Sequence, residues 1–258
     1  MNRNYKEIYS ESLKNPEEFW QKVSEDVFWF KKPTKILKKD NPPFYKWFED
    51  GVTNTCYNAL DLHIDQGRGD KTALIYDSPI TESKAKFTFK ELKEKVSKFA
   101  GALDKQGVKK GDRVIIYMPM IPEAVVAMLA CGRIGAIHSV VFGGFASNEL
   151  ASRIDDSKAK ILITASCGFE PGRTVEYRPL VDGALKLAKH QVEKVILFQR
   201  KGHEVKLNKP LEISWDEALS GADDKDCVEM GANDYAYILY TSGTTGIPKG
   251  IVRDIGGH

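Results

Sequence analysis

Beyond about residue 54, the apolar residues of this chain follow two alternating patterns. Some short segments are apolar at nearly every position, for example residues 113–118 (RVIIYM), which is typical of strands buried on both faces of a parallel sheet. Between these segments, apolar residues recur every three or four positions, as they do on one face of a helix. The pattern predicts strands at residues 72–76, 113–118, 137–142, 160–164, 195–198 and 235–240.

The segments with helical spacing also carry start and stop signals. Thr88 and Glu91 have the spacing of a capping box, in which each side chain binds the backbone N–H of the other residue. Asn54 can cap an earlier helix, and Gly67 can end it. We expect helices at 54–67, 88–103, 122–133, 148–154 and 180–189. Strands separated by segments of helical length predict an α/β fold with mainly parallel sheets flanked by helices.

Residues 1 to about 55 have a different character. Asn15 and Pro16 mark a helix start, because Asn is a good N-cap and Pro is favoured at the first helical position. A lysine-rich run follows at residues 31–40, KKPTKILKKD, with five lysines in nine residues. It contains no arginine, so we interpret it as a solvated connector rather than a nucleic-acid-binding patch. The segment 41–48 (NPPFYKWF) is expected to lie extended across another domain's surface.

Composition narrows the class of protein. The chain has 258 residues, of which 42% are hydrophobic, and its formal net charge is +2. So small a net charge gives no general reason to expect a nucleic-acid partner. The mean hydropathy is -0.36 and there is no run of about 18 apolar residues, so we expect no membrane-spanning helix. The cytoplasm is the default location, or the mitochondrial matrix if a presequence is missing from this chain.

The cysteines and histidines do not suggest a metal centre. The four cysteines, Cys56, Cys131, Cys167 and Cys227, stand far apart and form no C-x-x-C pair. That spacing fits neither a zinc site nor a dense disulfide framework. The five histidines likewise show no paired spacing. We therefore predict no metal site, and we expect each cysteine to be a small buried residue in a reducing compartment.

The strongest chemical signal is the glycine-rich segment after the last predicted strand. Residues 241–250 read TSGTTGIPKG, with three glycines, four hydroxyl side chains and one lysine. Glycines let backbone N–H groups turn toward one point, and the hydroxyls and the lysine add donors and charge, as a polyphosphate site requires. A Walker A loop is excluded, because two residues separate Gly246 from Lys249 and a glycine follows the lysine. The alternative is a glycine-rich linker, which seldom follows a buried strand in this order.

Together with Tyr240, this segment reads YTSGTTGIPKG and resembles the signature loop of the adenylate-forming superfamily, which includes acyl-CoA synthetases, luciferases and peptide-synthetase adenylation domains. Residues 54–63 (NTCYNALDLH), 67–70 (GRGD) and 75–79 (IYDSP) resemble the short-chain branch, the acetyl- and propionyl-CoA synthetases. The N-terminal 55 residues resemble the cap of those enzymes. The resemblance extends over essentially the whole chain. It implies that the phosphates of ATP are bound by Thr241, Ser242, Gly243, Thr244, Thr245, Gly246 and Lys249.

A second segment, VVFGGFA at residues 140–146, is similar to one that contacts coenzyme A in the acetyl-CoA synthetase group. Its adjacent glycines, Gly143 and Gly144, follow a predicted buried strand and allow a ligand or another backbone to approach closely. The alternative from the residues alone is a tight turn between a strand and a helix. The resemblance implies that both glycines help to bind coenzyme A.

A third segment consists of Glu170, Pro171, Gly172 and Arg173, in a predicted loop between a strand and a helix. An exposed guanidinium on a Pro-Gly turn suits an anionic group, although an ordinary surface turn explains it equally well. In acetyl-CoA synthetases the matching four residues bind coenzyme A, with an arginine at each end. Here Glu170 replaces the first arginine, which puts one phosphate contact in doubt. The EPGR form resembles the propionyl-type synthetases, so we interpret it as a mark of that subfamily.

The resemblance implies a ligase that uses ATP, Mg²⁺ and coenzyme A. It would convert a short-chain carboxylic acid, propionate and also acetate, to an acyl-adenylate and transfer the acyl group to coenzyme A. One alternative is an amino-acid-adenylating module, and another is a non-catalytic fragment that binds coenzyme A or a partner. The oligomeric state is left open.

By the same resemblance, residues 1–58 form the cap, which is mostly helical, and residues 59–258 form the AMP-binding domain, cut before its second half and its C-terminal domain. The catalytic lysine of the family lies in that C-terminal domain, so no catalytic residue is assigned here. We expect this chain alone not to form acyl-CoA at a useful rate. We also expect strand 235–240 to leave an open sheet edge.

Overall fold

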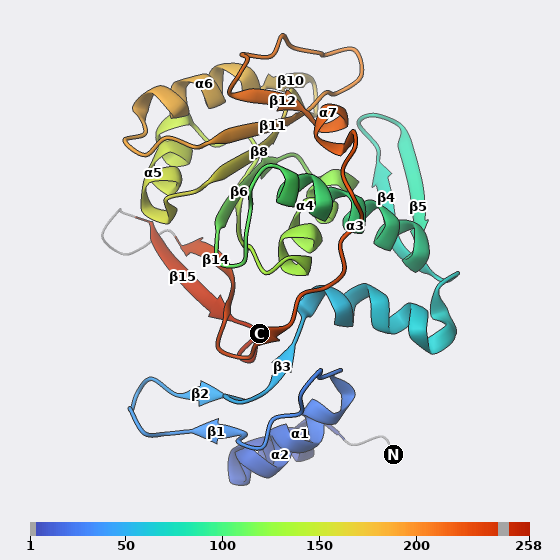
Figure 1. Cartoon of the computed structure of the whole chain (residues 1–258), viewed down its shortest axis with the longest axis vertical. Coiled ribbons are helices and arrows are strands. Elements are labelled where there is room, and N and C mark those ends of the chain that lie inside the picture. Colours follow the sequence, from blue (N-terminus) through green and yellow to red (C-terminus); the bar gives the residue numbers. More distant parts are fainter. Residues whose placement is uncertain (1–3, 242–247) are drawn as a thin grey trace.

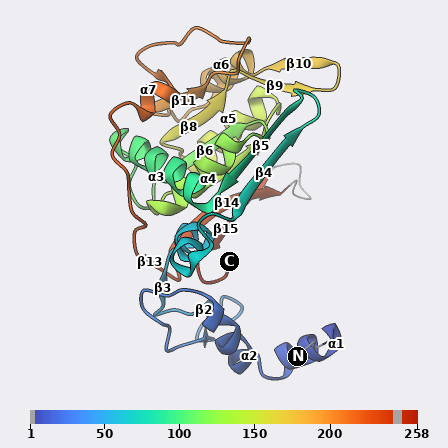
Figure 2. The ribbon, with the colours of Figure 1, turned by 90° about the vertical axis from the view of Figure 1, so that its right-hand side faces the viewer.

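The structure is a computed structural model, and it describes residues 4–241 and 248–258. It consists of a small N-terminal region and a larger α/β body, which carries most of the helices and strands (Figure 1). The chain enters the body through β3 (Val52–Thr53), which pairs antiparallel with β13 (Met230–Gly231). The second view shows the N-terminal region projecting below the body (Figure 2).

The N-terminal region begins with two helices and continues into a small hairpin. Its elements are α1 (Tyr5–Lys14), α2 (Pro16–Val23), η1 (Ser24–Asp26), β1 (Leu37–Lys38) and β2 (Lys46–Trp47). Pro16 occupies the first turn of α2, which confirms the predicted helix start. Part of the lysine-rich run is neutralised locally, because Lys38 contacts Glu49 and Lys39 contacts Glu17.

The body is built on a seven-stranded sheet with the order β12-β11-β8-β6-β7-β14-β15. Neighbouring strands are parallel except β14 and β15, which are antiparallel, so the predicted α/β fold with a mainly parallel sheet is confirmed. The strands are β6 (Arg113–Met118), β7 (Ile137–Phe142), β8 (Ile161–Ala165), β11 (Lys194–Phe198), β12 (Glu212–Ser214), β14 (Tyr235–Thr241) and β15 (Lys249–Asp254).

Helices cover both faces of this sheet. They are α3 (Phe89–Lys105), α4 (Pro122–Arg133), α5 (Ser147–Ser157), α6 (Tyr177–Leu187) and α7 (Trp215–Leu219). α3 packs against α4, and α5 packs against α6. The crossovers from β6 to β7 and from β7 to β8 run in opposite directions along the sheet, so right-handed connections put α4 and α5 on opposite faces. The capping box of α3 is present, with Thr88 Oγ1 accepting from the Glu91 N–H and Glu91 accepting from the Thr88 N–H.

Two hairpins lie outside the main sheet. The strand expected at 72–76 is present as β4 (Thr72–Ser78), but it pairs antiparallel with β5 (Ser83–Thr88) instead of joining the parallel sheet. Figure 2 shows this hairpin as a long ribbon beside the body. The second hairpin joins β9 (Cys167–Glu170) to β10 (Arg173–Glu176).

The helix expected at 54–67 is a helical segment with two π-type stretches, η2 (Tyr57–Asp61) and η3 (Ile64–Arg68). β15 was not predicted. It pairs with the outer side of β14, so the expected open edge at 235–240 is wrong, and β15 is the outer strand. Within the residues that the structure describes, no helix has both the length and the apolar character needed to cross a membrane.

Candidate functional site

The candidate segments gather at one edge of the sheet. Parallel strands of one sheet end at the same edge, so the segments that follow β6, β7, β8 and β14 meet there. The Gly143–Gly144 turn follows β7, and Thr241 ends β14, the strand next to β7. β6 and β8 are neighbouring strands whose crossover helices lie on opposite faces of the sheet. In open α/β sheets, ligands bind in the crevice at the carboxyl ends of two such strands.

The glycine turn after β7 is held by buried tyrosines. A Cβ on Gly143 would lie 2.1 Å from Tyr177 Oη and 2.8 Å from the Met118 carbonyl oxygen, so only glycine fits there. Tyr117 Oη accepts a hydrogen bond from the Gly144 N–H at 3.1 Å and donates one to the Phe145 carbonyl at 2.8 Å. Burial raises the pKa of Tyr117 to about 12, so the phenol keeps its proton at neutral pH. Close packing alone therefore accounts for Gly143.

Gly144 is different, because its surroundings are open. Its φ is +93°, which favours glycine, and a Cβ there would meet only Glu170 Oε1 at 3.8 Å and Val175 at 3.9 Å. The same neighbours show that the glycine turn and the Glu170–Arg173 segment lie side by side. The two segments assigned to coenzyme A by resemblance are thus brought together by the fold.

Glu170, Pro171, Gly172 and Arg173 form the turn of the β9–β10 hairpin, so the segment joins two strands and not a strand and a helix as predicted. Gly172 has a φ of +75°, as a tight turn requires. Arg173 Nη2 and Nε lie 2.6 and 2.7 Å from Glu170 Oε2. The Arg173 side chain is 71% exposed, so it can reach an anion, but Glu170 already offsets part of its charge.

The predicted phosphate-binding segment joins β14 and β15, the last two strands at one edge of the sheet. Thr241 and Lys249 are direct partners across β14 and β15, so both lie on one face of an antiparallel pair. Between them, Ser242, Gly243, Thr244, Thr245 and Gly246 lie outside the described residues. The sequence did not predict that a strand begins immediately at Lys249.

A buried arginine connects the two parts of the site. The Arg153 guanidinium lies 5.2 Å from the centre of the Tyr240 ring and 5.3 Å from that of Phe145. Its Nη1 donates to the carboxylate of Glu149 at 2.8 Å, and Tyr240 Oη donates to Asp156 Oδ2 at 2.7 Å. Helix α5 therefore holds both the strand end before Thr241 and the turn after Gly144.

Sequence reasoning missed these supporting side chains. Arg153 and Asp156 stand three positions apart on α5, a spacing that places both on one helix face, but nothing in the sequence identifies Tyr240 as their partner. Tyr117 was counted only as part of an apolar strand.

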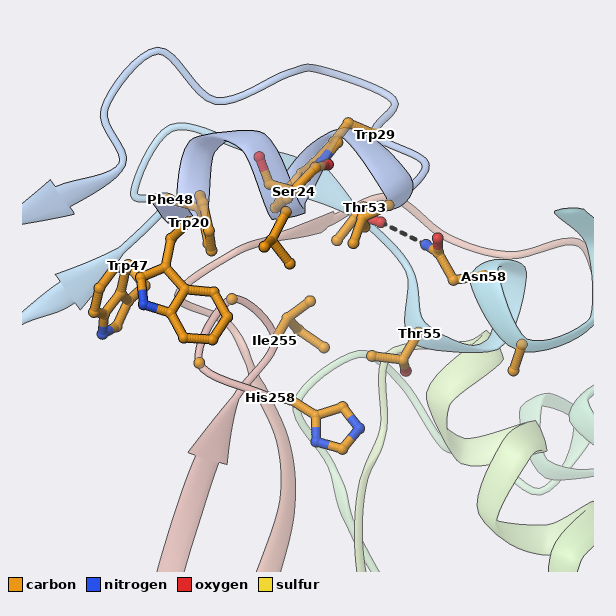
Figure 3. A pocket seen from close by; sticks show the side chains of 15 residues that line it. Trp20, Ser24, Trp29, Trp47, Phe48, Thr53, Thr55, Asn58, Ile255 and His258 are labelled. Carbon is orange, nitrogen blue, oxygen red and sulfur yellow. Dashed lines mark hydrogen bonds between the residues drawn. The ribbon is translucent and has the colours of Figure 1, made fainter. Parts of the chain in front are cut away.

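Two cavities are not lined by the candidate site residues. One, of about 650 Å³, separates the N-terminal region from the end of the chain (Figure 3). Trp20 and Trp47 wall one side of it and His258 the other, while Asn58 Nδ2 donates to Thr53 Oγ1 at 2.9 Å nearby. Another, of about 550 Å³, is a mainly apolar hollow beside β4, β6, β14 and α4. Val140, in the segment 140–146, lines the second cavity, but none of the candidate site residues lines either one.

Comparison with known proteins gives the family. The family model described as AMP-binding enzyme matches residues 63–257, which is most of the chain. The chain belongs to the AMP-binding enzyme family. A second model, acetyl-coenzyme A synthetase N-terminus, matches residues 5–59. The two matches follow one another along the chain and agree with the family resemblance seen in the sequence.

Individual relatives agree with this membership. The human protein named acyl-CoA synthetase short-chain family member 3, mitochondrial, is 53% identical over 255 residues, which cover 98% of this chain and 37% of the relative. An acetyl-coenzyme A synthetase of Xylella fastidiosa is 46% identical over 262 residues, covering 98% of this chain and 40% of that protein. The chain thus spans about two fifths of the length of these curated relatives.

A solved structure shows the same fold. The acetoacetyl-CoA synthetase from Streptomyces lividans matches with a TM-score of 0.88 at 27% identity, over 99% of this chain and 39% of that chain. The α/β architecture of this AMP-binding enzyme chain is therefore that of the N-terminal part of an acyl-CoA synthetase.

Proposed function

We propose that the complete protein is an AMP-forming short-chain acyl-CoA synthetase. A carboxylate would attack the α-phosphate of Mg²⁺-bound ATP, giving an acyl-adenylate and pyrophosphate. The thiol of coenzyme A would then displace AMP. The first step depends mostly on charge neutralisation and on in-line positioning of the phosphates. The main observation that supports this proposal is that the glycine turn after β7 and the signature segment after β14 follow adjacent parallel strands.

The residues divide into two groups with different roles. In the first, Thr241, Ser242, Gly243, Thr244, Thr245, Gly246 and Lys249 would hold the departing pyrophosphate. In the second, Gly143, Gly144, Glu170, Pro171, Gly172 and Arg173 would contact coenzyme A. The cross-strand pairing of Thr241 with Lys249 supports the first role, since it fixes both ends of the segment. The open space at Gly144 beside the exposed Arg173 supports the second.

We propose propionate as the preferred acid, with acetate second. The support is the EPGR form at residues 170–173, which resembles the propionyl-type synthetases. One methylene group is worth about 1–3 kcal/mol in a well-formed pocket, which corresponds to roughly 10- to 200-fold in kcat/KM. The preference should therefore be measurable but not absolute.

The test is formation of acyl-CoA by the complete protein with ATP, Mg²⁺, coenzyme A and each straight-chain acid of two to four carbons. The expected result is propionyl-CoA, identified by mass, with a kcat/KM above that for acetate. Amino acids serve as the control, because an amino-acid-adenylating module would activate one of them instead. Failure to form any acyl-CoA overturns the function, whereas a preference for acetate overturns only the choice of acid.

Three further assignments follow from the same proposal. The boundary between the cap and the AMP-binding domain lies near residue 58. The substrates are small molecules, and the activity is ascribed to the complete protein and not to residues 1–258 alone.

The cytoplasm is the proposed location, with the mitochondrial matrix as the alternative because several relatives carry "mitochondrial" in their names. Fractionation of cells that express the complete protein distinguishes the two.

A further inference from the structure

A buried arginine far from the candidate site holds two cysteines and an aspartate together. The Arg133 side chain, at the end of α4, has no exposed surface. Its Nη1 lies 2.7 Å from Asp61 Oδ2, 3.1 Å from Cys227 Sγ and 3.7 Å from Cys56 Sγ. Cys56 and Asp61 lie in one helical segment, whereas Arg133 and Cys227 are far from it in sequence, so the spacing of the cysteines gave no sign of the cluster. None of these side chains has a role in the proposed function.

A metal ion is the first possibility for such a cluster, and the geometry argues against it. Cys56, Asp61 and Cys227 each offer one ligand atom, and these atoms lie within 4.8 Å of one another. However, Arg133 Nη1 already contacts all three and supplies the positive charge that a metal ion would bring. A cation placed there would face a buried guanidinium, which cannot lose its proton.

We infer that Cys56 and Cys227 are a redox pair that forms a reversible disulfide on exposure to a peroxide. Their sulfur atoms lie within 4.8 Å, so rotation of the side chains and a small backbone shift would bring them to bonding distance. Cys227 is half-buried in a segment that has no regular secondary structure. Cys56 is buried but lines a cavity of about 240 Å³, which is large enough to admit hydrogen peroxide.

The surroundings favour Cys56 as the thiol that reacts first. A hydrogen bond from Cys227 and the charge of Arg133 lower the pKa of the Cys56 thiol, although burial opposes them. The Cys56 thiolate attacks one peroxide oxygen, the O–O bond breaks, and a sulfenic acid and hydroxide form. The Cys227 sulfur then attacks the sulfenyl sulfur. The S–S bond forms, the S–O bond breaks, and the leaving hydroxide takes the Cys227 proton to give water. In total two thiols are oxidised and one peroxide is reduced to two waters.

The disulfide would connect parts of the body that are about 170 positions apart in sequence. Cys56 opens the helical segment that follows β3, and Cys227 lies just before β13, the partner of β3. A crosslink over so long a loop restricts the unfolded chain strongly. Oxidation should therefore raise the melting temperature by several degrees, and a reductant should reverse the rise.

The test uses the 258-residue chain and does not depend on any enzymatic activity. The protein is treated with hydrogen peroxide or with dithiothreitol, the peroxide is removed, and free thiols are alkylated in denaturant before tryptic digestion without reduction. In the peroxide sample we expect residues 47–68 and 226–249 as one crosslinked species, two hydrogens lighter than the separate peptides. Dithiothreitol should abolish this species.

Variants with one cysteine removed serve as matched controls. Cys131→Ser and Cys167→Ser remove the other two cysteines, both buried, and should keep the crosslink. Cys227→Ser should lose it and should also lose the peroxide-dependent rise in melting temperature. The wild-type digest alone is decisive, so the inference does not depend on any variant folding. Recovery of Cys56 and Cys227 as alkylated thiols, or as sulfinic acids without a crosslink, from peroxide-treated protein that is still folded would overturn it.

Discussion

Arg153 lies with its guanidinium carbon 5.2 Å from the centre of the Tyr240 ring. Tyr240 directly precedes the signature segment, and the same guanidinium lies over Phe145, which directly follows the glycine turn. One buried side chain therefore contacts both strand ends that carry the proposed ATP and coenzyme A residues.

Replacing Arg153 by methionine should destabilise the chain while keeping the fold. Two cation–π contacts would be lost, each worth about 0.5–2 kcal/mol depending on how far it is desolvated. Each kcal/mol should lower the melting temperature by about 2–4 °C. Arg253→Met is the control, since Arg253 is exposed on β15, and its melting temperature should stay near that of the wild type. Equal melting temperatures for the two variants would show that Arg153 does not support the site.

Gly143 and Gly172 provide a matched pair of alanine substitutions. The new methyl group of Gly143→Ala would lie 2.1 Å from Tyr177 Oη, and overpacking of this kind costs about 1–3 kcal/mol. The new methyl group of Gly172→Ala would have no atom within 4 Å, so only the φ of +75° at this position disfavours alanine. In urea unfolding, Gly143→Ala should have the lower midpoint. Adding Tyr177→Phe should restore part of the loss, and a double variant no more stable than Gly143→Ala would contradict the clash.

Glu170→Gln should strengthen binding of coenzyme A to the complete protein. The substitution frees Arg173 from an exposed ion pair, and such pairs are worth up to about 1 kcal/mol, so the Kd should fall by as much as about fivefold. Calorimetric titration at low and high salt is the measurement, and the gain should shrink as salt screens the phosphates. Glu176→Gln, on the exposed end of β10, is the control. Weaker binding by Glu170→Gln would mean that the Glu170 carboxylate favours binding of the ligand and does not compete with it for Arg173.

The stability of the chain should fall in mild acid partly because of His138. Burial, with a smaller effect of the His258 charge, lowers the pKa of His138 to about 4, whereas an unfolded histidine titrates near 6.5. The folded chain therefore binds this proton less readily than the unfolded chain does. The contribution is complete above pH of about 6.5, is lost between about 6.5 and 4, and amounts to about 3 kcal/mol.

Urea midpoints measured from pH 7 to pH 4 test this dependence. In His138→Gln the urea midpoint should change less between pH 7 and pH 4 than it does in the wild type, whatever the substitution does to the midpoint at pH 7. His203→Gln, at an exposed position, should follow the wild-type curve. Parallel curves for wild type and His138→Gln would rule out the titration of His138 as the cause.

Local signals predicted most of the body's secondary structure. The apolar run of β6 and the capping box of α3 are written in consecutive residues and are found where expected. β5 and β15 were missed because both mix charged and apolar residues, and each is stabilised by a partner strand rather than by its own burial. β4 lies outside the main sheet because it pairs with β5, so its position could not be predicted while β5 was missed.

The candidate site was predictable only in part, for the same reason. Gly143 and Gly144 stand out because two adjacent glycines follow an apolar strand. The support from Arg153 and Tyr117, and the pairing of Arg173 with Glu170, depend on tertiary contacts that no sequence spacing encodes. The Cys56–Arg133–Cys227 cluster was missed entirely, because its members meet only after folding.

The most direct test of the account is acid-dependent exchange of labelled pyrophosphate into ATP by the complete protein. The account predicts exchange that requires Mg²⁺ and a short-chain acid, fastest with propionate, and that does not require coenzyme A. This isolates adenylate formation from thioester formation, so it tests the role assigned to the segment from Thr241 to Lys249 before any question about coenzyme A arises. No exchange with any acid of two to four carbons would contradict the account.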